Sequence, residues 1–384
     1  MVNVEKFFLH FSILASMIKR QIIPYLKKSR LNYPILVVLG PKYSGKTELV
    51  MNEFSKSNAS YVNLEDRIVL SKAKNDPAGF FKQYSFPIIL DEAHRAPELL
   101  KYMPNLIDGY KGEAKIVLIG LSHPALKKFA KKEFVAVINL MPRSIAECQG
   151  KKLEEYICSG FMPNVCYSKY YSDYLEKNVE YFANISNKDY FHKFVILLAK
   201  QLGQTVKLKS LAKKIGVSSV TLSLWLNVLE DSCVIFKLPC YIDNFGKRTV
   251  KGPKVYFTDV ALAAYLLGIE NSRQVESHDM FESLFENMVI AEILKNSCNA
   301  GEEPKLYHLT DNHNFKIDLI LHKKYVHLIN ITPKAHYNSA IASNLFRISE
   351  KIEKNKCLTV IYTGRHKTVA GINLRNFEDG LKFT

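Results

Sequence analysis

Short apolar runs recur through the first part of the chain and are separated by segments with helical spacing of apolar positions. Four runs have the length and β-branched content of strands buried on both faces, at residues 33–39, 86–90, 115–122 and 134–138. Strands that alternate with helices in this way form a parallel sheet covered by helices on both faces. The pattern therefore predicts an α/β core over residues 32–148.

The pattern changes after this core. Residues 149–204 are rich in Tyr and Phe and predict a helical region in which the aromatic rings pack inward. Residues 205–268 predict a winged helix, because two helices separated by a turn at Gly216 are followed by an apolar strand. The inward positions of the two helices are Leu208, Leu211, Ala212, Ile215, Leu222, Trp225, Leu226 and Leu229. Residues 1–31 predict a leading helical segment, and residues 269–384 predict an α/β C-terminal domain.

The apolar stretch at residues 7–17 is expected to be a helix that packs on the body of the protein. It lacks the positive start and the small-residue cleavage site of a signal peptide. No apolar run reaches the roughly 18–20 residues that a membrane-spanning helix needs. The pattern therefore predicts no membrane partner.

The net charge of the chain indicates which partners it could bind. The chain of 384 residues carries 53 basic and 37 acidic side chains, for a net charge of +16. This excess favours a polyanion such as nucleic acid, or a lysine-rich solvated surface, since only 10 of the basic residues are Arg. With 47% hydrophobic residues the chain is not of the disordered class. The 7 cysteines show no zinc spacing, so reduced thiols and a cytoplasmic location are expected.

A phosphate-binding loop follows the first predicted strand. Its spacing is Gly, four residues, then Gly-Lys-Thr, and the next residues can open a helix. In such a loop the backbone N–H groups face phosphate oxygens, Lys46 reaches the β and γ phosphates, and the Thr47 hydroxyl ligates Mg²⁺. The residues predicted to contact ATP are Gly40, Pro41, Lys42, Tyr43, Ser44, Gly45, Lys46, Thr47 and Glu48.

Acidic and polar residues end the next two strands. Asp91 is predicted to hold Mg²⁺, and Glu92 to orient and deprotonate the attacking water. Ser122 ends the third strand and is predicted to sense the γ phosphate. His94 completes the spelling of a helicase box, but the chain lacks a second motor domain with its arginine-rich motif. His94 is therefore expected to be a surface or loop residue.

With these motifs the chain resembles the prokaryotic AAA-type ATPases that join a P-loop core to a winged helix and a restriction-endonuclease-like domain. The resemblance runs from about Met17 to Gly364. Its motifs are Met17-Ile18-Lys19-Arg20, Asp76-Pro77, Asp91-Glu92-Ala93-His94-Arg95-Ala96-Pro97-Glu98-Leu99-Leu100, Ser159-Gly160-Phe161-Met162-Pro163, Lys247-Arg248, Lys251-Gly252-Pro253-Lys254-Val255-Tyr256-Phe257-Thr258-Asp259 and Leu284-Phe285-Glu286-Asn287. Since the family usually starts at the first of these, translation beginning at Met17 is a hypothesis.

The chain departs from the family at two arginine positions. A Gly-Arg pair is replaced by Glu133-Phe134, and an Arg-Asp pair by Lys177-Asn178. In the family a neighbouring subunit supplies a transition-state arginine, so a homo-oligomer is one expectation. Arg143 is taken as the catalytic substitute, with Arg95 as the other candidate.

The predicted winged helix suggests double-stranded DNA as a partner. Lysines gather around its first helix at Lys207, Lys209, Lys213 and Lys214, and the predicted wing at residues 247–254 is basic. Such lysines contact DNA phosphates, while the second helix enters the major groove. That helix, however, has no Arg and ends in Glu230-Asp231. A protein contact or a lid is therefore the alternative.

The C-terminal domain resembles an endonuclease core at Glu286 and Asp318. Such a core needs a second acid and a Lys on the next strand to hold Mg²⁺ and activate water. Asn330 and Thr332 stand at these positions. The domain is therefore expected to be a scaffold without nuclease activity.

Together these features predict an ATP-hydrolysing, Mg²⁺-dependent enzyme whose nucleotide state moves the winged-helix and C-terminal module, with a role on DNA. One alternative is a nucleotide-gated switch with slow turnover that binds DNA or a protein. A second alternative is an active Mg²⁺ nuclease.

Overall fold

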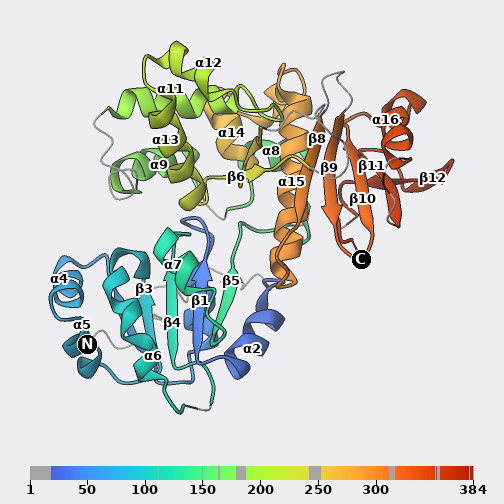
Figure 1. Ribbon diagram of the computed structural model, residues 1–384. Coiled ribbons are helices and arrows are strands. Elements are labelled where there is room, and N and C mark those ends of the chain that lie inside the picture. Colours follow the sequence, from blue (N-terminus) through green and yellow to red (C-terminus); the bar gives the residue numbers. More distant parts are fainter. Residues whose placement is uncertain are drawn as a thin grey trace. The chain divides into compact units, whose positions relative to one another are not determined.

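The computed structural model of the chain is shown in Figure 1. It describes residues 19–110, 112–148, 150–162, 165–178, 187–241, 252–310, 316–350, 352, 355–379 and 381–383. The apolar stretch at residues 7–17, the start at Met17 and most of the basic wing lie outside these residues. Backbone contacts divide the chain into two compact units. The first unit comprises Met1–Met141, Asp231–Cys233 and Cys298–Glu302, and the second comprises Pro142–Glu230, Val234–Ser297 and Glu303–Thr384.

The first unit is built on a parallel sheet of five strands in the order β2-β3-β4-β1-β5. The strands are β1 (Ile35–Leu39), β2 (Ser60–Asn63), β3 (Ile88–Asp91), β4 (Ile116–Gly120) and β5 (Val135–Asn139). The predicted α/β core with a parallel sheet is therefore confirmed (Figure 1). Because β4 lies between β1 and β3, the residues that follow these three strands meet at one edge of the sheet.

Helices cover both faces of this sheet. They are α2 (Ile23–Asn32), α3 (Lys46–Glu53), α4 (Arg67–Asn75), α5 (Pro77–Phe80), α6 (Met103–Leu106) and α7 (Pro124–Phe129), with 3₁₀ turns η1 (Phe81–Gln83), η2 (Ala93–Arg95) and η3 (Pro97–Lys101). Alternate residues of β1 enter two separate apolar clusters. Leu36 and Val38 pack with residues of α2 and α3, whereas Ile35 and Val37 pack with residues of α4, α5 and α7. This burial on both faces explains the continuous apolar runs in the sequence.

The second unit begins with a helical part. It contains η4 (Ile145–Glu147), α8 (Leu153–Ser159), α9 (Tyr167–Asp173), a π-helical turn η5 (Tyr174–Asn178), α11 (Lys188–Ala199), α12 (Leu208–Ile215), α13 (Ser219–Asp231) and α14 (Val260–Leu266). Gly216, with a φ of 89°, ends α12 in the left-handed conformation that favours glycine. After α13, β6 (Ile235–Leu238) pairs antiparallel with β7 (Lys254–Phe257). The order helix, turn, helix, strand is as predicted, and its assignment as a winged helix stays a prediction.

A mixed sheet of six strands forms the rest of the second unit, in the order β12-β13-β11-β10-β9-β8. The strands are β8 (Leu306–Thr310), β9 (Lys316–His322), β10 (Val326–Ile331), β11 (Lys356–Tyr362), β12 (Lys367–Val369) and β13 (Ile372–Asn376). The turn η7 (Ser272–Gln274) and the long helix α15 (Phe281–Asn299) precede the sheet, and α16 (Ser339–Ser349) packs on it through Leu345 and Ile348. Among the described residues, no helix has the length and apolar character needed to cross a bilayer.

Candidate nucleotide site

The loop between β1 and α3 is shaped by two glycines. A Cβ atom on Gly40 would lie 2.0 Å from the carbonyl oxygen of Leu140, so no side chain fits there. Gly45 has a φ of 87° and caps the N-terminus of α3. Between them, the Ser44 hydroxyl donates to the carbonyl of Pro41 (2.9 Å) and closes the turn. The predicted P-loop therefore has the strand, tight loop and helix that its spacing required.

Lys46 is buried inside this loop, with 6% of the residue exposed. Its Nζ donates to the carbonyls of Gly40 (3.0 Å) and Pro41 (2.7 Å). Burial lowers the pKa of Lys46, while the carboxylates of Glu92 and Asp91 oppose that shift. The loop thus holds the ammonium next to the two acids predicted to act with it.

Thr47 and Asp91 lie side by side. The Thr47 hydroxyl donates to Asp91 Oδ2 at 2.6 Å, although the two residues are 44 positions apart. Tyr61 on β2 donates its hydroxyl to the same oxygen (2.9 Å). Burial and the charge of Asp91 raise the pKa of Tyr61, which keeps the hydroxyl protonated as a donor.

Tyr61 was missed by the sequence reasoning because β2 itself was not predicted. Its only sequence signal is the short stretch Ser60-Tyr61-Val62-Asn63 between two helices.

Glu92 follows β3 in a left-handed backbone conformation, with a φ of 55° and a ψ of 37°. Its N–H donates to Asp91 Oδ1 (2.9 Å), and its carbonyl accepts from the N–H of Arg95 (2.9 Å). Burial raises the pKa of the Glu92 carboxyl, while Lys46 opposes this shift. Glu92 therefore lies directly beside the Thr47–Asp91 pair, and its role as the base stays a prediction.

The expectation that His94 is a surface residue was wrong. His94 is 1% exposed, because η2 turns its ring inward beneath the end of β4. Burial lowers the pKa of His94 to about 3. Ser122 lies in the half-buried segment between β4 and α7, one residue after Leu121. Its role as a γ-phosphate sensor stays a prediction.

The other predicted residues are arranged around the loop. Tyr43 is 44% exposed at the loop surface, and Glu48 lies in the first turn of α3. Lys42 Nζ lies 3.7 Å from Glu65 Oε1, and an Arg95 nitrogen lies 3.8 Å from the same oxygen. Arg95, which belongs to the first unit, is therefore paired with Glu65.

Arg143 does not belong to the first unit, which contains the P-loop, Asp91 and Glu92. It belongs to the second unit, where its backbone N–H donates to the carbonyl of Phe161 (3.2 Å). The assignment of Arg143 as a catalytic residue stays a prediction.

The residues present fit ATP with Mg²⁺. Gly40 and Gly45 let the loop backbone turn tightly, as a loop whose N–H groups face phosphate oxygens requires. Hydroxyl and carboxylate oxygens of Thr47 and Asp91 are the hard ligands that Mg²⁺ prefers. Lys46 supplies the cation that phosphate oxygens require.

Comparison with known families agrees with this geometry. Residues 32–149 match the sequence model of a family described as AAA domain. Over these residues the chain is similar to the P-loop ATPase domains of the AAA type, which agrees with a nucleotide-binding role for the loop. Residues 150–273 and 281–375 each match a domain of unknown function, DUF8612 and DUF4143 respectively.

The curated proteins that match the chain are distant relatives. Uncharacterised proteins of Mycobacterium tuberculosis and Mycobacterium bovis are each 23% identical over 291 residues, which cover 72% of this chain and 65% of the relative. The chain thus spans slightly less than two thirds of these proteins.

Among solved structures, the Walker-type ATPase of Pyrococcus abyssi has a TM-score of 0.41 at 14% identity, covering 64% of this chain and 95% of that one. A RuvB mutant of Thermotoga maritima has a TM-score of 0.29 at 17% identity, covering 65% and 92%. The assignment above rests on the family match and the observed sheet, and not on these low scores.

The second unit brings the two predicted nuclease acids together. Lys316 Nζ lies 3.0 Å from Asp318 Oδ1 on β9 and 3.9 Å from Glu286 Oε2 on α15. Lys254 (3.3 Å) and the Tyr256 hydroxyl (2.5 Å) both donate to Glu286 Oε1. Burial and the nearby Asp318 raise the pKa of Glu286. The two carboxylates therefore face ammonium groups of the protein itself.

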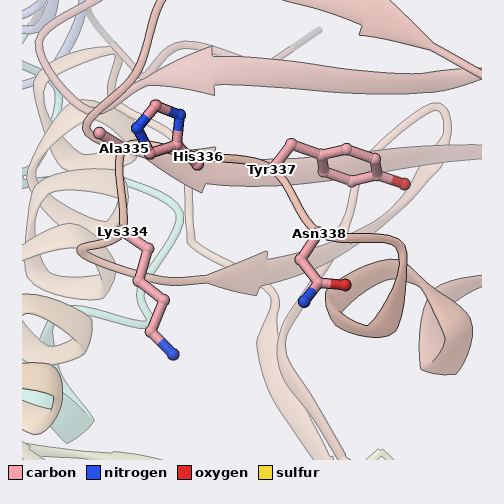
Figure 2. A pocket seen from close by; sticks show the side chains of 5 residues that line it. All are labelled: Lys334, Ala335, His336, Tyr337 and Asn338. Atoms are coloured by element: carbon pink, nitrogen blue, oxygen red, sulfur yellow. The ribbon is translucent and has the colours of Figure 1, made fainter.

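The predicted neighbours of this pair are also buried. Asn330 on β10 and Thr332 just after it are 7% and 9% exposed. Lys334 lies on the exposed loop 334–338, which lines a shallow surface pocket (Figure 2), and its Nζ is 3.9 Å from Glu282 Oε1. Within the described ranges, no group of three or more His, Cys, Asp or Glu side chains could hold a metal ion.

Proposed function

We propose that the chain is a Mg²⁺-dependent ATPase. The observation that carries this proposal is the 2.6 Å hydrogen bond between Thr47 and Asp91, with Glu92 next to it on the same edge of the sheet. Two metal-ligating oxygens and a base converge there from the P-loop and from β3. This convergence is what hydrolysis requires beyond nucleotide binding.

Each residue has a role in this proposal. The P-loop amides and Lys46 bind and orient the phosphates, and Thr47 and Asp91 hold the metal. Mg²⁺ would neutralise charge on the β and γ phosphates. Glu92 accepts the proton of the attacking water, and burial favours this by raising the pKa of its carboxyl, although Lys46 opposes that shift.

The test is steady-state ATP hydrolysis by the purified full chain, with Lys46→Ala and Glu92→Gln beside the wild type. Lys46→Ala should lose both binding and turnover, whereas Glu92→Gln should bind ATP and lose turnover. A wild type that binds ATP and barely turns over would favour the nucleotide-gated switch. A specific observation supports that alternative, since Arg95 in the first unit is already paired with Glu65.

We also propose that the nucleotide cycle moves the second unit. Arg20 supports this idea, because it donates to the carbonyl of Ser44 in the P-loop and to the carbonyl of Met141 (both 2.8 Å). Met141 is the last residue of the first unit before the chain continues into the second. A change in the P-loop would thus reach the start of the connection. Distance measurements between spin labels on the two units, with and without ATP, test this proposal.

DNA contact through the predicted winged helix is a further part of the proposal. Lys207, Lys209, Lys213 and Lys214 are exposed around α12. The outer face of α13 is less suited to reading bases, because Val220 and Leu224 are exposed there and Asn227 accepts a hydrogen bond from Lys237 (2.8 Å). We therefore expect salt-sensitive contact with phosphates without sequence preference.

Paired charge reversals test this contact. The double variant Lys213→Glu and Lys214→Glu should weaken duplex DNA binding and flatten its salt dependence. The matched control reverses Lys72 and Lys74, which lie in the last turn of α4 as the first pair does in α12. An equal loss of DNA affinity in both double variants would mean that binding depends on the net charge of the protein and not on the lysines of α12.

We propose that the second unit has no nuclease activity. Lys254 and Lys316 contact the carboxylates that would otherwise ligate a metal. Incubating supercoiled plasmid with the protein and Mg²⁺ tests this. Nicking that disappears in Asp318→Ala would overturn the proposal.

A further inference from the structure

His94 lies between the predicted base and the end of β4. Its Nε2 atom is 3.5 Å from Glu92 Oε2, and its Nδ1 atom accepts a hydrogen bond from the N–H of Leu121 (3.4 Å). Leu121 directly follows β4, the strand that separates β1 from β3. The ring therefore connects Glu92 to a neighbouring strand through its two nitrogen atoms.

The bond to Leu121 determines where the proton of the ring is. A backbone N–H can only donate, so Nδ1 must carry the lone pair. A neutral imidazole then has its proton on Nε2, the atom that faces Glu92. Burial lowers the pKa of His94 to about 3, which keeps the ring neutral near pH 7. His94 thus presents an N–H donor to the Glu92 carboxylate.

Packing fixes the position of the ring. A Cβ atom on Gly120 would lie 3.1 Å from His94 Nδ1, so the ring rests directly on the backbone of β4. The same Cβ would lie 3.2 Å from Leu126 of α7, which covers this place from the other side. The ring cannot shift unless the end of β4 moves with it.

Glu92 itself needs such support. Its backbone adopts the left-handed conformation, which is unfavourable for residues with a side chain and persists where the surroundings enforce it. The hydrogen bonds to Asp91 and from Arg95 fix its backbone. His94 is the described group at ion-pair distance from its carboxylate, which is 18% exposed.

We propose that His94 is a positioning residue that holds the Glu92 carboxylate in line for proton transfer and ties it to the end of β4. The proposal rests on the ATPase function proposed above. Contacts of this kind are often long in the unbound protein and shorten when the reacting groups assemble. Since Ser122 follows Leu121, any shift of this segment would be passed through the ring to Glu92.

Glutamine should replace His94 in this role. Its amide offers an acceptor oxygen and a donor nitrogen on one carbon, much as the ring offers Nδ1 and Nε2–H. Leucine fills the space and offers neither. A matched control is His123→Asn, because His123 is the neighbouring histidine and caps α7 through Nδ1, a cap that asparagine can keep.

The experiment compares wild type, His94→Leu, His94→Gln and His123→Asn in three measurements. They are kcat for ATP, the ATP dissociation constant from displacement of a fluorescent analogue, and ¹⁵N NMR of labelled histidines. We expect His94→Leu to lower kcat about 10- to 100-fold, the loss expected for one hydrogen bond to a charged group. ATP affinity should stay within about twofold, His94→Gln should recover most of the rate, and His123→Asn should match the wild type.

The NMR measurement does not depend on turnover. The His94 resonances should show a neutral ring protonated on Nε2, and Glu92→Gln should shift Nε2 far more than Nδ1. An Nδ1–H ring, or an Nε2 signal that ignores Glu92→Gln, would overturn the proposal. So would an unchanged or raised kcat in His94→Leu while the wild type hydrolyses ATP. If the wild type does not hydrolyse ATP, the proposed function fails. The NMR result still shows whether the Nε2–H group of His94 contacts the Glu92 carboxylate.

Discussion

At the scale of single residues, motif spacing predicted which side chains gather at one edge of the first sheet, while their roles in binding and catalysis stay predictions. Thr47, Asp91 and Glu92 were predicted to act together, and the structure places them side by side. Motif spacing could do this because strand ends of one parallel sheet must meet. His94 and Tyr61 show the limit, since burial beneath β4 and a partner across the sheet depend on tertiary packing that no local pattern records.

Tyr61 is predicted to tune the metal site. In Tyr61→Phe, Asp91 loses one of its two side-chain donors, so the carboxylate is held less firmly. The Mg²⁺ concentration for half-maximal hydrolysis should rise about 10-fold or more, as for other partners of metal ligands. A Mg²⁺ titration at saturating ATP measures this. Tyr84→Phe, at a partly buried tyrosine away from the site, is the control, and an unchanged midpoint in Tyr61→Phe would contradict the assignment.

At the scale of elements, apolar runs predicted four of the five strands of the first unit. β1 and β3 begin directly after Pro34 and Pro87, because proline cannot donate a hydrogen bond to the sheet. β2 was missed because it is an edge strand in which only Val62 is fully buried. Because β2 has no continuous apolar run, its signal in the sequence is weak, whereas β5 at the other edge has such a run.

The junction of β1 with the P-loop gives a prediction at this scale. Gly40→Ala should destabilise the protein by about 1–3 kcal/mol or more, because the new Cβ collides with the carbonyl of Leu140. Gly45→Ala has no contact within 3.8 Å and should cost only about 1 kcal/mol of backbone strain. Urea unfolding compares the two variants. If Gly45→Ala loses more stability than Gly40→Ala, the backbone at Gly40 must shift easily to make room for the new Cβ atom.

At the scale of the whole molecule, six segments of the chain form two compact units, three segments in each. The predicted helical region, winged helix and C-terminal domain belong to one unit because long-range hydrogen bonds join them. Asp259 accepts from the backbone of Phe161 and from the Tyr167 hydroxyl, and Asn287 accepts from the backbone N–H of Phe257. Composition and spacing indicate segments, whereas such buried pairings decide how segments combine.

His308 makes the stability of the second unit depend on pH. It is fully buried, its Nε2 lies 3.0 Å from the carbonyl of Gly252, and burial lowers its pKa to about 4 from an ordinary 6.5. Between these values the unfolded chain binds a proton that the folded chain does not. The contribution of His308 to the free energy of unfolding is therefore fully present above pH 6.5 and is lost as the pH drops towards 4. It amounts to at most about 3 kcal/mol.

Denaturant unfolding at about pH 7 and about pH 5 checks this prediction. The wild type should lose more stability between the two conditions than His308→Gln, whatever the stability of the variant at the higher pH. His336→Gln, at an exposed loop histidine, should behave as the wild type. Equal losses in all three proteins would contradict the assigned pKa shift.

The cluster around Glu286 also limits how the chain can evolve. The side chains of Lys254 and Glu286 are at most 10% exposed and pair with each other, so deleting one of them leaves a charge inside the protein without its counterpart. Such a loss typically costs about 3–5 kcal/mol, a large share of the stability of a domain. Single-step replacements at these two positions would mostly yield chains that fail to fold. Among descendants of a common ancestor, the two positions are therefore expected to be kept together or exchanged together.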